Sequence, residues 1–233
     1  MATKKQQEAK AVAVTSARPS YLAQEENINI PDAGSGNRFP RIKLLQQLSP
    51  EVDKDDEKCV PDAEAGMILV EPARGGETVL FDGDSGLTFI PVFVREQFVE
   101  WVPQKLGGGW VASYDSMEEA LQLKAADNEI NHSIDYLVVS PQVGGGKTPL
   151  LLQFNSISKM TAARALQKSI STNETMSGIT YRLRAARKTN KANQKYYTYE
   201  IEPAFWTDKT LYEAIEALKA ENPNGFSEEP APF

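Results

Sequence analysis

The segment "GITYRLRAARKTNKANQKYYTYEIEP" (residues 178–203) constrains the fold more than any other part of the chain. Side chains of a strand point alternately to the two faces of a sheet. One predicted face is apolar and consists of Ile179, Tyr181, Leu183 and Ala185, whereas Arg182 and Arg184 lie on the opposite face. The second half alternates in the same way, and a polar, basic tip between the halves is typical of a turn. The segment therefore predicts a β-hairpin with one face in a core.

Most other apolar stretches are rich in β-branched and aromatic residues, which favour strands. Strands are expected at 67–72, 87–103, 106–116, 134–140 and 148–156. A first short helix is expected to begin at Ser116, because Glu119 completes a capping box. A second helix is expected at 158–170, with Met160, Ala163, Leu166 and Ile170 on one face, and a third, amphipathic helix at 208–222.

This order of elements predicts a mainly β protein with a few helices (α+β), organised as an OB-fold-like five-stranded Greek-key barrel. Strands 1 to 3 would come from 67–156, a helix at 158–170 would precede the final hairpin, and Lys188 to Lys195 would be the loop between strands 4 and 5. This nucleic-acid-binding domain is expected at 38–220. A flexible N-terminal segment (1–37) precedes it, and a flexible acidic C-terminal tail (221–233) follows the C-terminal helix.

Charge is distributed unevenly along the chain. The window from Lys147 to Tyr199 holds ten basic residues and one acidic residue, a net charge of +9. The whole chain carries −7, so the rest of it carries −16. This polarity indicates a polyanion site on one part of the molecule and acidic segments elsewhere. A solvated basic face is the plain alternative.

No motif predicts catalysis, a metal or a cofactor. "VGGGKTP" (143–149) lacks the first glycine of a phosphate-binding P-loop, since Pro141 stands at that position, and a strand-like run follows it instead of a helix. Cys59 and His132 are each alone, which excludes an internal disulfide and argues against a Cys/His zinc site. The chain has no apolar stretch of membrane-span length and no secretory signal at its start, so a cytoplasmic protein is expected.

The hairpin combines positive charge with aromatic rings, the two requirements for sequence-neutral binding of single strands. One of its two tyrosine sets is expected to lie exposed beside the arginines. The nucleic-acid-binding residues predicted there are Arg182, Arg184, Arg187, Lys188, Lys191, Lys195, Tyr196 and Tyr199. Trp101, Lys105 and Trp110 around the "VPQKLGGG" turn form a second candidate platform, for which core packing is an equal alternative.

The chain ends in "GFSEEPAPF", an acidic, proline-rich segment that closes on Phe233. This ending resembles the tails of bacterial single-stranded DNA-binding proteins, which close on Pro-Phe, and of the T7-type bacteriophage single-stranded DNA-binding proteins, whose acidic tails end in Phe. "FPRIKLLQQLSPEV", "IPVFVREQFVEWVPQKLGGGWVAS" and the hairpin segment are similar to phage-encoded proteins of this type. Unlike those families, this tail has no run of aspartates. The resemblance implies partner binding by Glu228, Glu229 and Phe233.

These observations together predict a non-enzymatic, OB-fold-type, sequence-independent single-stranded DNA-binding protein of a phage, located in the host cytoplasm. It would act in DNA replication, recombination and repair, and its tail would recruit a polymerase, a helicase/primase or a nuclease. Two alternatives stay open: a phage virion or scaffold protein with a basic face, and an enzyme with a dispersed carboxylate–metal site. No membrane partner is expected, and homo-oligomerisation is left open.

Overall fold

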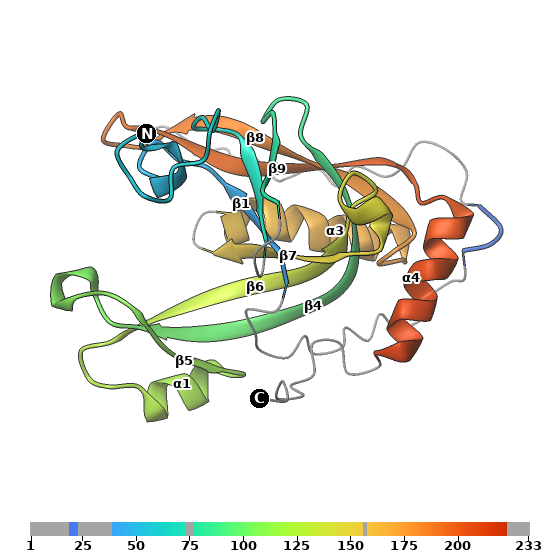
Figure 1. The fold of residues 1–233 in the computed structure, drawn as a ribbon. Helices are drawn as coiled ribbons and strands as arrows, with labels where there is room; N and C mark the ends of the chain where they lie inside the picture. The colour runs from blue at the N-terminus through green and yellow to red at the C-terminus, as the bar shows by residue number, and fades with distance from the viewer. Residues whose placement is uncertain (1–18, 23–38, 73–76, 156–157, 223–233) are drawn as a thin grey trace, which may run out of the picture.

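The computed structural model describes residues 19–22, 39–72, 77–155 and 158–222. In this part of the chain nine strands form one sheet, which curls into an open half-barrel (Figure 1). The strands are β1 (Arg41–Leu44), β2 (Ile68–Glu71), β3 (Val79–Phe81), β4 (Leu87–Trp101), β5 (Trp110–Tyr114), β6 (Glu129–Val139), β7 (Pro149–Asn155), β8 (Ile179–Thr189) and β9 (Lys195–Trp206). The spatial order is β3-β2-β1-β7-β6-β4-β8-β9, with β5 also paired to β4.

Three α-helices and several short helical turns connect these strands. The α-helices are α1 (Met117–Leu123), α3 (Arg164–Asn173) and α4 (Lys209–Glu221). The shorter turns are η1 (Pro50–Val52), η2 (Gln104–Leu106), η3 (Gly144–Gly146) and the π-helical η4 (Lys159–Ala163). No helix of the described residues is both long enough and apolar enough to cross a membrane.

β4 organises the sheet because it pairs with three other strands along its length. Its first residues pair with β8, where Leu87 faces Leu183 and Phe89 faces Tyr181. From Ile90 onward it pairs with β6 along one edge, and its last residues pair with β5 on the other edge. The ends of β4 and β6, together with β5 and α1, form a projecting unit of residues 95–133, which we call the arm (Figure 1).

The main core lies where α3 packs between the β8–β9 hairpin and strands β6 and β7 (Figure 1). Ala163, Leu166 and Ile170 are buried there against side chains of seven strands. Among these strand residues, Phe89 and Tyr181 stack with their ring centroids 5.8 Å apart. α3 therefore closes the inside of the half-barrel.

The opposite face of the sheet is only partly covered, by α4. Asp208 caps this helix by accepting a hydrogen bond from the Thr210 backbone amide at 2.9 Å. Leu211, Ile215 and Leu218 follow at helical spacing and pack with Phe93, Leu137 and Leu151 of the sheet. Further along the same strands this face becomes polar, and these polar positions make up the candidate site.

The mainly β, α+β class is confirmed, but the strand count is not. Residues 67–156 contribute six strands, β2 to β7. Five of them lie in the predicted strand runs and β3 does not, whereas the barrel template assigned only three strands to this range. The sheet is an open half-barrel of nine strands. A single sequence run such as 87–103 predicts a strand without revealing that it will pair with three partners. The expected order of a helix followed by a final hairpin is confirmed by α3, β8 and β9.

Local predictions agree with the structure in several places. Ser116 accepts a hydrogen bond from the Glu119 backbone amide at 3.1 Å, as a capping box requires. The glycine run at η3 leads directly into β7, so it lacks the following helix of a P-loop. Met160 is an exception, since it is 51% exposed instead of buried. The π-helical turn η4 inserts extra backbone into the first turn of the helix and shifts its face relative to α3.

Part of the predicted flexible N-terminal segment contacts the domain. The Tyr21 hydroxyl donates to the backbone carbonyl of Thr207, and Leu22 is buried. The remainder of 1–37 and nearly all of the predicted tail lie outside the described residues, so the predicted domain boundaries stay predictions.

Candidate nucleic-acid interface

The tip of the β8–β9 hairpin carries a compact group of exposed cations. The Asn190 side-chain oxygen accepts from the backbone amides of Ala192 and Gln194, both at 2.9 Å, and this fixes the turn. Arg187, Lys188, Lys191 and Lys195 surround the turn and are exposed. Within the described part of the chain, no carboxylate forms an ion pair with these four side chains. Their charge is therefore available to an external anion.

Arg182 and Arg184 lie on the outward face of β8, as the alternation predicts, and Tyr181 and Leu183 are buried. The two arginines are nevertheless paired. Glu202, directly opposite Arg182 in the register, lies 2.8 Å from Arg184 Nη2 and 3.9 Å from Arg182 Nη1. A phosphate that binds here has to compete with this carboxylate, which sequence reasoning had not placed beside the arginines.

The tyrosines of β9 divide between the two faces of the strand. Tyr196 is half-buried and stands opposite Lys188, on the face that carries the arginines. Tyr199 is only 8% exposed, because its ring packs edge-on against Phe154 and its hydroxyl donates to the Ile42 carbonyl. Burial raises the pKa of Tyr199. The expectation that Tyr199 offers an exposed ring to nucleic acid is therefore wrong, because its ring belongs to the core.

The second predicted platform lies at the end of the arm. Trp101 and Trp110 face each other in the β4–β5 register and are 39% and 60% exposed. Lys105 is exposed in the turn between them. These two aromatic rings are thus placed at the surface and not in the core.

The sheet register arranges the uncovered face into rows that cross β4, β6 and β7. Next to the apolar row beneath α4 comes a row of Arg95, Asp135 and Gln153, of which the first two are charged. The following row consists of Gln97, Ser133 and Asn155, then comes Val99 with Asn131, and finally Trp101. Along this face the side chains are therefore first apolar, then charged, then amide-bearing and finally aromatic.

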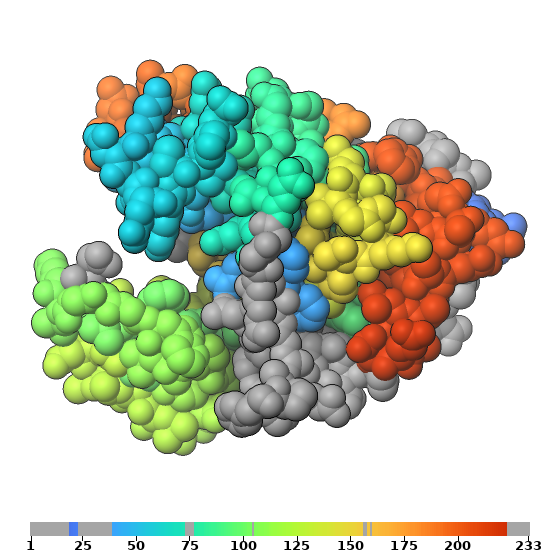
Figure 2. All heavy atoms as spheres, in the orientation of Figure 1, coloured from blue at the N-terminus to red at the C-terminus, as the bar shows by residue number. Residues whose placement is uncertain are grey.

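Two adjoining hollows open on this face. The first, which we call the arm hollow, has a volume of about 580 Å³ and reaches from Trp101 and Trp110 to Arg95 and Arg41. Figure 2 shows a notch between the arm (green) and residues 39–72 (blue to cyan). The second, which we call the fork hollow, has a volume of about 500 Å³. The two hollows share Arg41, Leu151, Gln153 and Asn155 and so form one continuous strip.

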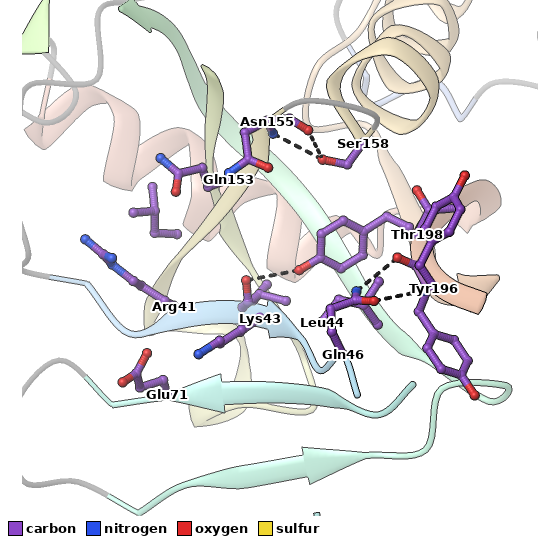
Figure 3. A pocket seen from close by; sticks show the side chains of 14 residues that line it. Arg41, Lys43, Leu44, Gln46, Glu71, Gln153, Asn155, Ser158, Tyr196 and Thr198 are labelled. Carbon is purple, nitrogen blue, oxygen red and sulfur yellow. Dashed lines mark hydrogen bonds between the residues drawn. The ribbon is translucent and has the colours of Figure 1, made fainter. Parts of the chain in front are cut away.

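The fork hollow opens where β1 and β7 separate. These strands pair only at Arg41 with Leu151 and at Ile42 with Leu152. Beyond this point Lys43 lines one side of the hollow and Asn155 the other, with Tyr196 near its end (Figure 3). Gln46 holds the start of β9 in place, because its side chain donates to the Tyr197 carbonyl and accepts from the Tyr197 amide, both at 2.9 Å.

Asp135 is fully buried at the base of the arm hollow and is surrounded by donors. It accepts from Gln97 Nε2, from Arg95 Nη2 at 3.4 Å and from Ser133 Oγ at 3.2 Å. The Gln153 side chain also hydrogen-bonds to it. Burial raises the pKa of Asp135, while the Arg95 charge and these hydrogen bonds act in the opposite direction. The carboxylate therefore organises the polar groups around it.

The strip brings together the predicted Trp101, Trp110 and Tyr196 with residues that sequence reasoning missed. The missed residues are Arg41, Lys43, Arg95, Gln97, Asn131, Gln153 and Asn155. A signal for one of them exists in the sequence, because Gln153 interrupts the otherwise apolar run of residues 149–154. Within the described residues, no three His, Cys, Asp or Glu side chains cluster in a way that could hold a metal ion. The predicted partner-binding residues Glu228, Glu229 and Phe233 lie outside the described residues.

By its fold and its site, the chain is a mainly β protein with an open strip of aromatic, amide and cationic side chains on one sheet face. A family model described as "Pam3 phage gp34-like protein" matches residues 31–223, and the chain belongs to this family. The expected phage origin is thereby confirmed. No curated protein and no solved structure matches the chain.

Proposed function

We propose that this protein binds single-stranded DNA in a sequence-tolerant way and acts in phage DNA replication and recombination. One observation carries the proposal: the continuous strip has aromatic rings at both ends, Trp101 and Trp110 at one and Tyr196 at the other, with Arg41 between them. Positive charge that follows a backbone and rings on which bases stack are the requirements for such binding.

The charges of the strip indicate that the strip and the hairpin tip have different roles in binding. Lys43 pairs with Glu51, and Arg95 pairs with Asp135, so much of the cationic charge on the floor is balanced within the protein. The exposed cations of the hairpin tip adjoin Tyr196 at one end of the strip. The hairpin therefore supplies most of the phosphate attraction, and the strip supplies positions for bases.

Tryptophan fluorescence provides the test. Two of the three tryptophans, Trp101 and Trp110, line the strip, whereas Trp206 is partly buried and packs against the main core. Titration with oligo(dT) in EDTA is expected to quench the emission, more strongly for longer oligonucleotides. A Trp206→Phe variant, as the matched control, should show the same or a larger fractional quench. An unchanged spectrum at low salt, or tighter binding to duplex DNA, would refute the proposal.

A phage virion or scaffold protein is the second candidate. The arm exposes apolar side chains, among them Leu106 (62%), Leu121 (58%) and Leu123 (64%), which could contact another protein. The same titration separates the candidates, because a scaffold protein need not bind oligo(dT). The dispersed carboxylate–metal enzyme is also separated, since binding in EDTA does not depend on a metal.

The C-terminal tail is proposed to recruit replication proteins. Glu228, Glu229 and the terminal carboxylate supply negative charge, and Phe233 supplies an apolar anchor. Such an end fits an apolar pocket ringed by Arg or Lys on a polymerase, a helicase/primase or a nuclease. This part of the proposal rests on the sequence alone.

A further inference from the structure

The arm hollow contains more amide side chains than sequence-neutral binding requires. Gln97, Asn131, Gln153 and Asn155 all line it, and they come from three adjacent strands. Stacking and phosphate contacts are indifferent to base identity. Amide side chains, in contrast, carry both a donor and an acceptor and form paired hydrogen bonds with base edges. A cluster of four in the arm hollow, two of which also line the fork hollow, indicates a position where a base is read.

Asp135 fixes the orientation of the amide most deeply placed in this cluster. The Gln97 amide nitrogen donates to the Asp135 carboxylate. A flipped amide would bring its oxygen against the carboxylate instead, and two acceptors repel each other. The flip is therefore blocked, and the Gln97 oxygen points away from Asp135. One amide hydrogen is engaged with Asp135, so the oxygen and the second hydrogen form the edge that remains for a ligand.

We infer that the arm hollow is a nucleobase-reading subsite that selects adenine, through an amide edge held in one orientation by Asp135. This inference rests on the proposed single-strand binding and deepens it. An amide pairs with adenine in a bidentate way, with its oxygen accepting from the 6-amino group and its nitrogen donating to a ring nitrogen. Asn155 stands in the same row as Gln97, across Ser133, and is exposed to the same hollow.

The reading position and the aromatic platform serve different nucleotides. Gln97 and Trp101 lie on the same face of β4, four residues apart, which corresponds to roughly 13 Å along a strand. A base stacked on the tryptophan pair therefore belongs to another nucleotide than the base at Gln97. The protein thus combines sequence-tolerant contacts along most of the strip with one selective position.

The test uses oligo(dT) with a single central substitution, so that self-stacking of an all-adenine strand does not interfere. Affinities of the full-length protein are compared for oligo(dT), for the same strand with one dA, and for one deoxynebularine, which is adenine without its 6-amino group. The dA strand is expected to bind at least about fivefold more tightly than the other two strands. Fivefold is the lower end of the discrimination that one bidentate amide–adenine pair provides.

Substitutions then locate the effect. Gln97→Met keeps the length of the side chain but removes both hydrogen-bonding groups. It should reduce the ratio of dA-strand affinity to oligo(dT) affinity to about one, whatever its effect on the oligo(dT) affinity itself. Asn155→Ala, at an exposed position, provides a second variant that does not depend on the buried cluster. Gln122→Met on the exposed face of α1 is the matched control and should retain the preference.

The outcomes separate this inference from the function on which it rests. Equal affinity for all three strands would overturn the adenine subsite and leave single-strand binding intact. A preference for dA that survives in both Gln97→Met and Asn155→Ala would also overturn it. Binding to none of the oligonucleotides would overturn the proposed function and the subsite together.

Discussion

Removal of the hairpin-tip charges tests the proposed function most directly. The perturbation is the combined substitution of Arg187, Lys188, Lys191 and Lys195 by alanine. All four side chains are exposed and have no carboxylate partner among the described residues. The turn itself is held by Asn190, which stays in place. The variant is therefore expected to fold normally and to lose only its attraction for phosphate.

The magnitude follows from the number of charges removed. Each phosphate contact on a single strand contributes about 0.7 to the slope of log affinity against log salt. Four lost contacts make the slope shallower by about 2.8. Over a fourfold rise in salt, for example from about 50 to about 200 mM, the unmodified protein should lose about 50-fold more affinity than the variant.

The assay is the oligo(dT) titration repeated at several salt concentrations. A matched control replaces four exposed cations outside the hairpin and outside the loop that contacts it, Lys147, Arg164, Lys168 and Lys209, and so removes the same charge. The salt slope of the control should differ from that of the unmodified protein by no more than about 0.7, the contribution of one phosphate contact. If both variants flatten the slope equally, the effect is long-range and the hairpin does not contact phosphate. An unchanged slope in the hairpin variant would refute the reasoning.

Three further predictions concern the core, the arm and the tail. Leu183→Ala should lower the free energy of unfolding by about 2–5 kcal/mol in urea denaturation, because Leu183 is fully buried. Arg182→Ala should change the free energy of unfolding by about 1 kcal/mol or less. Similar losses for both variants would contradict the assignment of Leu183 to the core face and Arg182 to the outward face. The Tyr114 hydroxyl, Asn128 and the Ala125 amide hydrogen-bond to Glu100 and lower its pKa, so their stabilisation is present above the ordinary glutamate pKa and is lost as the pH falls through the lowered value. The protection of the arm amides against hydrogen exchange, measured relative to the intrinsic exchange rate at each pH, should therefore fall in acid. Glu100→Gln should remove this pH dependence, and equal acid sensitivity in the variant would contradict it. Deletion of 226–233 should leave the melting temperature unchanged, and Phe233→Ala should remove most partner capture from infected-cell extract; identical partners for intact and Phe233→Ala proteins would exclude a docking role.

Several features could be predicted from sequence because they depend on neighbours along the chain. The alternation in 178–203 predicted the hairpin and the buried positions of Tyr181 and Leu183. The Ser116 cap and the amphipathic pattern of α4 are likewise local. The opposite placement of Tyr196 and Tyr199 was also available, because residues three apart on a strand cannot share a face.

Cross-strand pairing could not be predicted in the same way. Glu202 meets Arg182 and Arg184 only because the length of the turn sets the β8–β9 register. The five-strand barrel was wrong because β4 pairs with β5, β6 and β8. Periodicity along one strand does not show which strands will pair with it, since its partners come from distant parts of the chain. The π-helical turn that exposes Met160 breaks the helical period on which the prediction relied.

The sequence by itself determined a mainly β chain and a basic hairpin, whereas it left open whether Trp101 and Trp110 beside the glycine turn are exposed or buried. Only the tertiary structure decided which polar and aromatic side chains share one open face. Arg41, Gln97 and Gln153 are more than fifty residues apart along the chain, and the sheet order β1-β7-β6-β4 brings them to one face. α4 covers the apolar part of that face and leaves its polar part open. The physical reason is that periodicity assigns a side chain to a face, whereas strand order and packing decide which faces are joined and which stay uncovered.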